Sequence, residues 1–302
     1  MQEINTYRLR RVSQVPILLL ILFVATRCVH RPMLPPNSPV GTTVRVRLGD
    51  TGGAIRHLAI EEYVKGSVLA EMPLTGVTPV SARRLAEVQA ILARTYALSN
   101  LNRHAREGFD LCATTHCQVY HPPESQPPAL MTLVTAAARR TEGVVITHKH
   151  RPIQAVFHAD CGGHTSSAQS VWGGPPPPYL HGNRDLFCDK RRPPPWRFLI
   201  DTSTLRNALN SNKETAVGSQ LTAIQVKQRD AAGRAMHITL RGERTRVVHA
   251  TVVRTILLDQ FGPSSIKSTR LDVHLNGNTF VFKGTGHGHG VGLCQIGAIA
   301  RA

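Results

Sequence analysis

Acidic side chains are scarce in this chain, and long apolar runs are nearly absent. Its 302 residues hold 19 Asp and Glu against 36 Lys and Arg, a formal net charge of +17. The apolar run at residues 15–25 (VPILLLILFVA) is short for a helix that crosses a membrane. The low acidic content predicts an anionic partner, and the short run favours an export signal over a membrane span.

Aromatic residues are also few, at 5% of the chain, and the basic residues are scattered. No recognition helix and no aromatic platform for RNA is visible, so we do not expect nucleic acid as a partner. For an exported protein the anionic cell envelope is the favoured partner. A solvated basic surface without a specific ligand is the alternative.

The N-terminus has the order of an export signal. Three arginines (Arg8, Arg10 and Arg11) precede the apolar run, so residues 1–28 are predicted to be a signal peptide or an N-terminal anchor. A lipoprotein reading of Cys28 is disfavoured by Arg27 before it. Residues 29–43 are the expected linker. We expect an exported protein in the periplasm, in the cell wall or anchored to the membrane, with membrane contact if the signal is uncleaved.

The remaining chain, residues 44–302, predicts an α+β fold of mixed helices and antiparallel strands. Apolar periodicity predicts helices over 60–71, 81–100, 131–140 and 248–261, with Leu85, Val88, Leu92, Tyr96 and Ser99 on one face of the second. Strands are expected at 44–48, where apolar and basic residues alternate (VRVRL), at 271–275 and at 279–282. Residues 144–146 and 153–158 are expected to pair, and residues 224–229 and 235–240 to form a hairpin around Asp230. A basic, proline-rich stretch at 190–195 suggests two lobes, 44–189 and 196–302.

Glu71 stands at the predicted end of the first helix. Pro73 lacks an N–H and disfavours the α conformation in the residue before it, so the helix should stop at Glu71 or Met72. A carboxylate there meets the negative end of the helix dipole, and burial would raise its pKa further. A carboxyl group that stays protonated near neutral pH can act as a general acid, although a solvent-facing glutamate is the alternative.

Cysteine and histidine gather between residues 104 and 121. His104, Cys112, His116 and Cys117, with His121 nearby, suit tetrahedral zinc. In an exported protein a Cys112–Cys117 disulfide competes with the metal. Cys161 and Cys188 are candidates for another disulfide, and nothing near Cys161 predicts an activated nucleophile.

A glycine-rich segment closes the chain. Residues 284–298 (GTGHGHGVGLCQIGA) alternate glycine with His287 and His289, which predicts a tight backbone path carrying two imidazoles. The segment lacks the Lys-Ser/Thr pair of a phosphate-binding loop. Arg94, within a helix of small apolar residues, is a candidate partner for an acidic group or a surface arginine.

Five segments in this order resemble one family. EEYVKGSVLAEMP, ILARTYAL, CATTHCQVY, HADCGGHTSSAQSVWGG and GHGHGVGLCQIGA are similar to motifs of the stage II sporulation protein D (SpoIID/LytB) family, whose enzymatic members are lytic transglycosylases. The resemblance implies cleavage of the β-1,4 bond between N-acetylmuramic acid and N-acetylglucosamine in stem-free peptidoglycan, leaving a 1,6-anhydro sugar. The family name is no sign that the organism sporulates.

The resemblance also implies roles for single residues. Glu71 takes the place of the family's one catalytic acid and base, which needs no cofactor. The implied substrate-binding residues are Arg94, Tyr179, His287, His289 and Gln295. The implied ligands of a structural zinc ion are His104, Cys112, His116 and Cys117. The expected partners are peptidoglycan glycan strands and a cell-wall amidase.

The chain departs from the family pattern in three places. Five extra residues lie between Glu71 and Arg94, and His181 replaces a lysine often found there. The chain also stops after the glycine segment, where relatives continue, which suggests a truncated C-terminus. One rival function is a non-catalytic wall-binding protein or amidase activator of the LytB type. The other is a zinc hydrolase that uses His287, His289 and the cysteine-containing residues 112–117.

Overall fold

The computed structural model describes residues 41–49, 52–191 and 193–302. The predicted signal and most of the predicted linker lie outside these residues. The first sheet has β1 (Thr43–Arg47) at its centre, antiparallel to β2 (Ile55–Ala59) and parallel to β3 (Leu111–Cys112). The alternation predicted for β1 is confirmed, because Val44 and Val46 are fully buried while Arg45 turns to Asp110.

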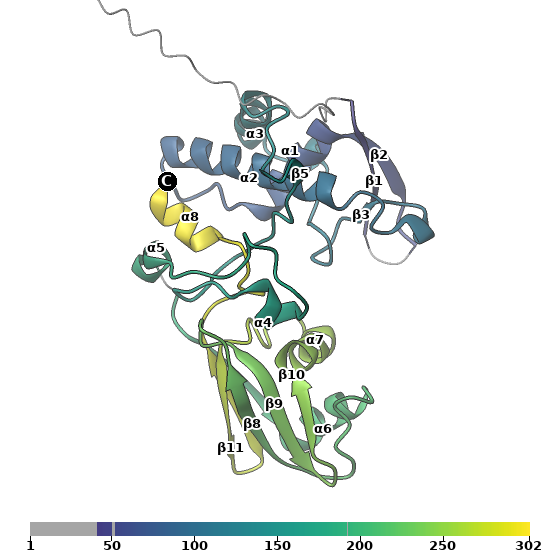
Figure 1. Cartoon of the computed structure of the whole chain (residues 1–302), viewed down its shortest axis with the longest axis vertical. Coiled ribbons are helices and arrows are strands. Elements are labelled where there is room, and N and C mark those ends of the chain that lie inside the picture. The colour runs from purple at the N-terminus through teal and green to yellow at the C-terminus, as the bar shows by residue number, and fades with distance from the viewer. Residues whose placement is uncertain (1–40, 50–51, 192) are drawn as a thin grey trace, which may run out of the picture. The chain divides into compact units, whose positions relative to one another are not determined.

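Two helices, α1 (Ile60–Glu71) and α2 (Pro79–Ser99), pack beside this sheet, and α3 (Pro128–Arg140) packs on both of them (Figure 1). The apolar face predicted for α1 is buried, and the helix ends at Glu71 with Met72 in an extended conformation. On α2 the predicted face is buried at Leu85, Leu92 and Tyr96 but not at Val88. Val88 is 39% exposed, and the small residues Ala86, Ala90 and Ala93 lie in the core instead, which lets neighbouring helices approach closely.

The second half of the chain builds two further three-stranded sheets. One has the order β10-β9-β8, from β8 (Leu221–Arg229), β9 (Ala235–Gly242) and β10 (Arg246–His249). The other has the order β11-β12-β7, from β7 (Trp196–Asp201), β11 (Leu271–Asn276) and β12 (Thr279–Gly284). With α6 (Thr202–Asn210) and α7 (Ala250–Phe261) they share one apolar core. The predicted hairpin around Asp230 is confirmed, whereas β7 and α6 were not predicted.

The predicted pairing of residues 144–146 with 153–158 is shifted. The short strands β4 (Thr147–His148) and β5 (Arg151–Pro152) pair with each other, while β6 (Phe157–His158) pairs in parallel with β13 (Leu293–Cys294). The glycine segment thus reaches the middle of the chain, a contact that local patterns do not encode. The loops after β6 hold two short helices, α4 (Ala168–Trp172) and α5 (Leu186–Lys190).

The last helix, α8 (Gln295–Arg301), does not pack on the two sheets of the second half of the chain but lies beside α5 and α2 (Figure 1). Ala298, Ile299 and Ala302 pack against the core that α1, α2 and α3 share. The helix α8 therefore meets the C-terminus of α1, where Glu71 stands, although 224 residues separate Gln295 from Glu71. Within the described residues, every helix is too short or too polar to span a bilayer.

Candidate active site

The Glu71 carboxyl group is half-buried at the C-terminus of α1. Its Oε1 atom accepts a hydrogen bond of 2.6 Å from the main-chain N–H of Val119. Burial raises the pKa of Glu71 above its ordinary value, and the Val119 bond opposes this by stabilising the ionised form. The helix end predicted from Pro73 therefore carries a carboxyl group whose proton is held to higher pH than in water.

The segment that supplies Val119 lies directly on α1. Gly66 makes this possible, because a Cβ atom there would lie 2.2 Å from the ring of Tyr120. Tyr120 stacks on Tyr63 of α1 with ring centroids 5.8 Å apart, and the Tyr63 hydroxyl donates to Gln118. The position of Val119, and hence of its bond to Glu71, is set by these contacts on both sides.

Gln295 holds the main chain of Glu71 from the opposite end of the sequence. Its Nε2 atom donates a 2.8 Å hydrogen bond to the Glu71 carbonyl oxygen. The last carbonyls of a helix lack partners within the helix, so this bond satisfies one that would otherwise be unpaired. Gln295 is 8% exposed. The structure therefore shows it in contact with the helix end that carries the candidate acid, rather than facing the cavity beside it.

Glu71 lines a cavity of about 790 Å³, a volume typical of ligand sites. Segments from across the sequence form its wall, among them Tyr96, Arg103, His116, Trp172 and His289. Within the described part of the chain, Glu71 is the one carboxyl group that lines this cavity. Hydrolysis of a sugar bond usually uses two carboxyl groups, so the cavity suits a reaction that needs only one.

Trp172, His158 and His289 line one side of the cavity, to which the glycine segment contributes His289. Trp172 is 53% exposed, and its ring lies 5.1 Å from that of His289. Burial lowers the pKa of His289 to about 3, and its Nδ1 atom accepts from the N–H of Val291. His289 is therefore a neutral group at physiological pH, next to His158 at 5.5 Å between ring centroids.

His287 does not share this cavity. Its side chain is exposed, and its main chain pairs with that of Asp160. In the described residues, neither His287 nor His289 belongs to a group that could hold a metal ion. The glycine segment instead wraps around buried Arg234, which donates to the Gly288 carbonyl, and a Cβ at Gly290 would lie 2.3 Å from the Arg234 Nε.

Arg94 stands apart from Glu71. Its side chain is completely buried and makes two bonds, of 2.8 Å and 2.7 Å, to the carboxylate of Glu61 on α1. Arg94 has no exposed surface and does not line the Glu71 cavity, so the expected contact with a sugar stays a prediction. The guanidinium that does line the cavity is that of Arg103, which is exposed beyond the end of α2.

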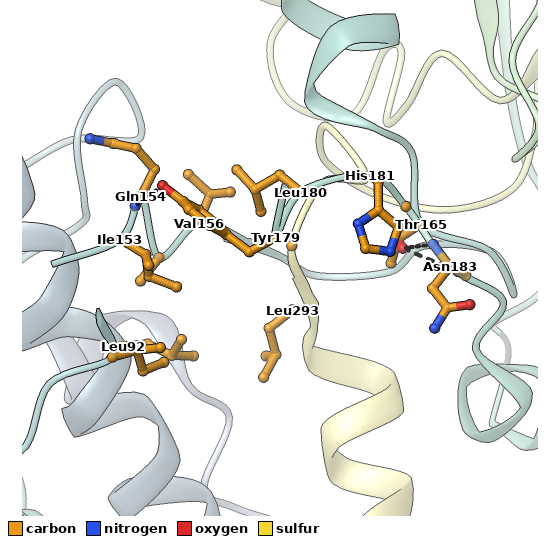
Figure 2. A pocket seen from close by; sticks show the side chains of 14 residues that line it. Leu92, Ile153, Gln154, Val156, Thr165, Tyr179, Leu180, His181, Asn183 and Leu293 are labelled. Carbon is orange, nitrogen blue, oxygen red and sulfur yellow. Dashed lines mark hydrogen bonds between the residues drawn. The ribbon is translucent and has the colours of Figure 1, made fainter. Parts of the chain in front are cut away.

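Tyr179 lines a second cavity, of about 400 Å³ (Figure 2). Its hydroxyl accepts a 3.3 Å hydrogen bond from the N–H of Gln154, and His181 lies on the same cavity wall. Gln154, Val156 and Leu180 line both cavities, so the two are neighbours. Tyr179 is thus placed beside the Glu71 cavity and not inside it.

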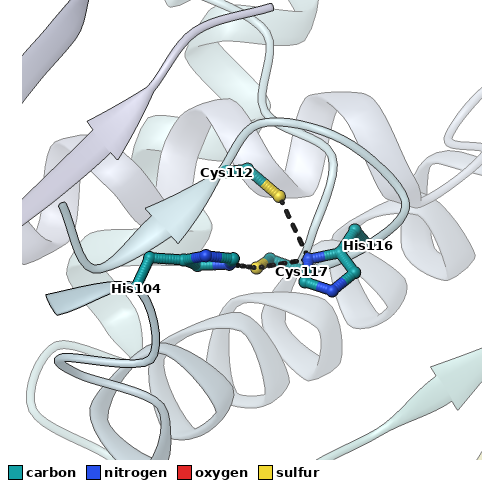
Figure 3. A group of neighbouring side chains, drawn as sticks. All are labelled: His104, Cys112, His116 and Cys117. Atoms are coloured by element: carbon teal, nitrogen blue, oxygen red, sulfur yellow. Dashed lines mark hydrogen bonds between the residues drawn. The ribbon is translucent and has the colours of Figure 1, made fainter. Parts of the chain in front are cut away.

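His104, Cys112, His116 and Cys117 converge as the sequence predicted (Figure 3). The His104 Nε2 lies 3.3 Å from the Cys117 sulfur, and the His116 Nδ1 lies 3.6 Å from both sulfurs. A tetrahedral zinc ion with bonds of 2.0–2.3 Å separates its ligand atoms by about 3.3–3.8 Å. The donor set and its spacing therefore fit a metal ion, and both cysteines are free.

The surroundings of this cluster would also suit a metal ion. The other ring nitrogen of His104 lies 2.6 Å from the Glu107 carboxylate, which orients the Nε2 atom towards the sulfurs. The His104 ring also stacks on buried Phe109 at 4.5 Å. His116 and Cys117 line the Glu71 cavity. The cluster thus forms part of the cavity wall, two residues from the Val119 N–H.

Sequence reasoning missed Arg103, Trp172, His158 and Val119 as cavity or contact residues. Trp172 had a usable signal, because it lies in an irregular Gly/Pro-rich segment of the kind that often carries function. Val119 acts through its main chain, so its side-chain type holds no information about its role.

Comparison with known proteins adds family matches. A family model described as "Stage II sporulation protein" matches residues 49–148, and one for a domain of unknown function matches residues 195–292. An uncharacterized protein of Brachyspira hyodysenteriae is 30% identical over 263 residues, which cover 87% of this chain and 66% of that protein. The chain thus spans about two thirds of the length of this relative.

Two relatives from Bacillus subtilis carry descriptive names. Stage II sporulation protein D is 25% identical over 258 residues, which cover 81% of this chain and 69% of that protein. A protein named amidase enhancer is 24% identical over 285 residues, which cover 79% of this chain and 37% of that protein.

Proposed function

Because this chain belongs to the SpoIID family, we propose that it is a peptidoglycan lytic transglycosylase with Glu71 as its single acid and base. One observation carries the proposal. Among the described residues, Glu71 is the one carboxyl group that lines a cavity large enough for sugars, and its pKa is raised. The proposed substrate is the stem-free glycan strand, cut between N-acetylmuramic acid and N-acetylglucosamine.

The reaction needs two proton transfers, one from Glu71 and one back to it. Protonated Glu71 donates to the oxygen that links C1 of the muramic residue to the next sugar, and the C1–O bond breaks. The muramic C6 hydroxyl then attacks C1, and the Glu71 carboxylate accepts the proton that this hydroxyl loses. The products are a 1,6-anhydro end and a free 4-hydroxyl group. Glu71 returns to its protonated form, and no water is consumed.

The cavity offers a separate group for each part of this substrate. The Arg103 guanidinium suits the lactyl carboxylate of a muramic residue that has lost its stem peptide. The exposed face of Trp172 suits the apolar side of a sugar ring. Neutral His289 can exchange hydrogen bonds with hydroxyl or acetamido groups without adding charge. Tyr179 and His181 extend the same surface into the neighbouring cavity.

Zinc at the cysteine–histidine cluster would support this site without entering the reaction. The proposed ligands are His104, Cys112, His116 and Cys117. A bound zinc ion would supply structural cross-linking, which fixes the segment that donates the Val119 N–H to Glu71. Metal analysis of the full chain and of Cys112→Ser tests this. A Cys112–Cys117 disulfide in peptide maps, with no metal lost in the variant, would contradict it.

The activity is tested on purified stem-free glycan strands. Wild type should yield 1,6-anhydromuramyl products by mass spectrometry, and Glu71→Gln should be about 10²–10⁴-fold slower. Glu62→Gln is the matched control, because Glu62 lies on the same helix and is mostly exposed. It should match wild type. Equal rates for Glu71→Gln and wild type, or hydrolytic products with a reducing end, would overturn the proposal.

The relative named amidase enhancer supports a second candidate, activation of a cell-wall amidase. A purified amidase acting on cell wall would then be accelerated equally by wild type and by Glu71→Gln, with no glycan cleavage by either. Both functions place the protein outside the cytoplasm, in line with the predicted export signal at residues 1–28.

A further inference from the structure

A second group of metal-ligand atoms lies outside the active site. Asp160, Cys161, Cys188 and Cys294 bring one carboxylate and three sulfurs within 4.8 Å of one another, and all four residues are buried. They come from three separated segments: the turn after β6, helix α5, and the junction of β13 with α8. We propose that these four residues form a second metal centre that binds one Zn²⁺ ion through three thiolates and the Asp160 carboxylate.

The sulfurs are surrounded by hydrogen-bond donors suited to thiolates. The Cys294 sulfur accepts from the N–H groups of Cys161 at 3.3 Å and Gly297 at 3.4 Å. The Cys161 sulfur accepts from Gly163 N–H at 3.3 Å. The Cys188 thiol donates to the Asp160 Oδ1 atom at 3.1 Å, and once that thiol loses its proton the two anions would repel each other without a cation between them. A metal ion at this point satisfies both groups.

Buried arginines complete the charge balance. Arg234 is 1% exposed, donates to the carbonyls of Gly288 and Asp160, and has a buried Nε without a hydrogen-bond partner. The Arg270 Nη1 is likewise buried without a partner, close enough to the turn that a Cβ at Gly162 would lie 2.5 Å from it. Four anionic ligands and one divalent ion leave two negative charges, and these two guanidiniums supply positive charge next to the turn that carries Asp160 and Cys161.

Metal binding explains this arrangement better than a disulfide. A disulfide between any two of the cysteines would remove two anionic donors and leave the third thiol and Asp160 beside buried cations. All three cysteines are free thiols in the structure. Their sulfurs and one carboxylate oxygen form a four-donor set of the kind that zinc favours. On binding, each thiol releases its proton to solvent and bonds to the ion.

The centre would also support the active site at a distance. Cys294 precedes Gln295, which binds the Glu71 carbonyl, and it lies opposite His158 of the cavity wall in the β6–β13 pair. A metal ion there ties α5 and α8 to the turn after β6. This second role rests on the proposed function, whereas the metal site itself does not.

The test is the metal content of the full chain, purified without chelators and under anaerobic conditions. Wild type should contain two zinc ions per chain. Cys188→Ser and the double variant Cys112→Ser/Cys117→Ser should each contain one. Cys28→Ser, which changes the remaining cysteine, and Glu71→Gln should keep both ions, so a failed activity test leaves this result unaffected. One ion in wild type, retained by Cys188→Ser, would overturn the proposal.

The absorption spectrum of bound Co²⁺ is a second measurement, which reports the ligands of the ion directly and not only the metal content. In the Cys112→Ser/Cys117→Ser background, bound Co²⁺ should show thiolate-to-cobalt charge-transfer absorption and the visible bands of a tetrahedral ion. Adding Cys294→Ser should lower the charge-transfer intensity by about a third, because two thiolates remain of three. Absence of this absorption, together with a disulfide among Cys161, Cys188 and Cys294 in peptide maps, would show that the group is a redox pair and not a metal site.

Discussion

The Glu71 side chain is under two opposing influences. Burial disfavours its ionised form, while the Val119 N–H favours it. Burial is the larger of the two effects, so the pKa of Glu71 is raised. A proposed general acid benefits from this balance, since it stays protonated to higher pH. The same burial lowers the stability of the folded protein at neutral pH, because it holds an ionised carboxylate where water solvates it poorly.

Glu71→Gln should therefore stabilise the protein near neutral pH. The folded pKa lies above the unfolded one of about 4.3, so the folded state binds more protons and wild-type stability falls as pH rises between the two values. Each unit of difference costs about 1.4 kcal/mol. Urea unfolding should show Glu71→Gln more stable than wild type at pH 7, with the gain lost near pH 4. A gain that persists at pH 4 would contradict this.

The helices α1 and α2 are joined by a buried ion pair. Arg94 has no exposed surface, and its partner Glu61 is 24% exposed at its side chain. Arg94 also donates to the Val144 carbonyl, which follows α3. The pair thus connects the helix that bears Glu71 with the helix before Arg103, and it explains an arginine among small apolar residues without any substrate.

Removal of the Glu61 charge should be costly. Glu61→Gln leaves the Arg94 guanidinium buried without its counter-charge and should lower the free energy of unfolding by about 3 kcal/mol. Glu61→Leu/Arg94→Met, which removes both charges, should lose less. Glu87→Gln breaks the exposed pair with Arg140 and should cost less than about 1 kcal/mol. Equal losses for Glu61→Gln and Glu87→Gln in urea unfolding would refute this assignment.

On the scale of the whole molecule, the candidate active site depends on segments that are far apart in the sequence. Gln295 is 224 residues from Glu71 in sequence and binds its carbonyl oxygen. The β6–β13 pair brings the glycine segment beside the loops that carry Trp172. The helix end that bears Glu71 is therefore positioned by the last helix as well as by the segment after Cys117.

Gln295→Ala should lower kcat for glycan cleavage by about 10- to 100-fold and leave KM nearly unchanged. The physical reason is that Gln295 holds the main chain of the acid and does not face the cavity, so its loss displaces Glu71 without removing a sugar contact. Steady-state kinetics on stem-free glycan measure both constants. A large rise in KM with kcat retained would instead support the expected substrate-binding role of Gln295.

Several elements followed from local patterns alone. The helix ending at Glu71, the alternation of β1 and the hairpin around Asp230 all depend on residues a few positions apart. The His104–Cys117 cluster was also predictable, because its ligands lie within fourteen consecutive residues. By contrast, β7 and the β6–β13 pair were missed, since their partners are distant in sequence.

The sequence by itself therefore determined where α1 ends, which acid stands there and which residues could share a nearby metal ion. Spacing, proline geometry and side-chain chemistry act over a few residues, so they can be recognised from the sequence alone. Only the tertiary structure decided that Arg94 pairs with Glu61, that Arg103 and Trp172 line the cavity, and that Cys188 and Cys294 meet Asp160 and Cys161. Such contacts arise when separated segments bury their surfaces together, which no local pattern specifies.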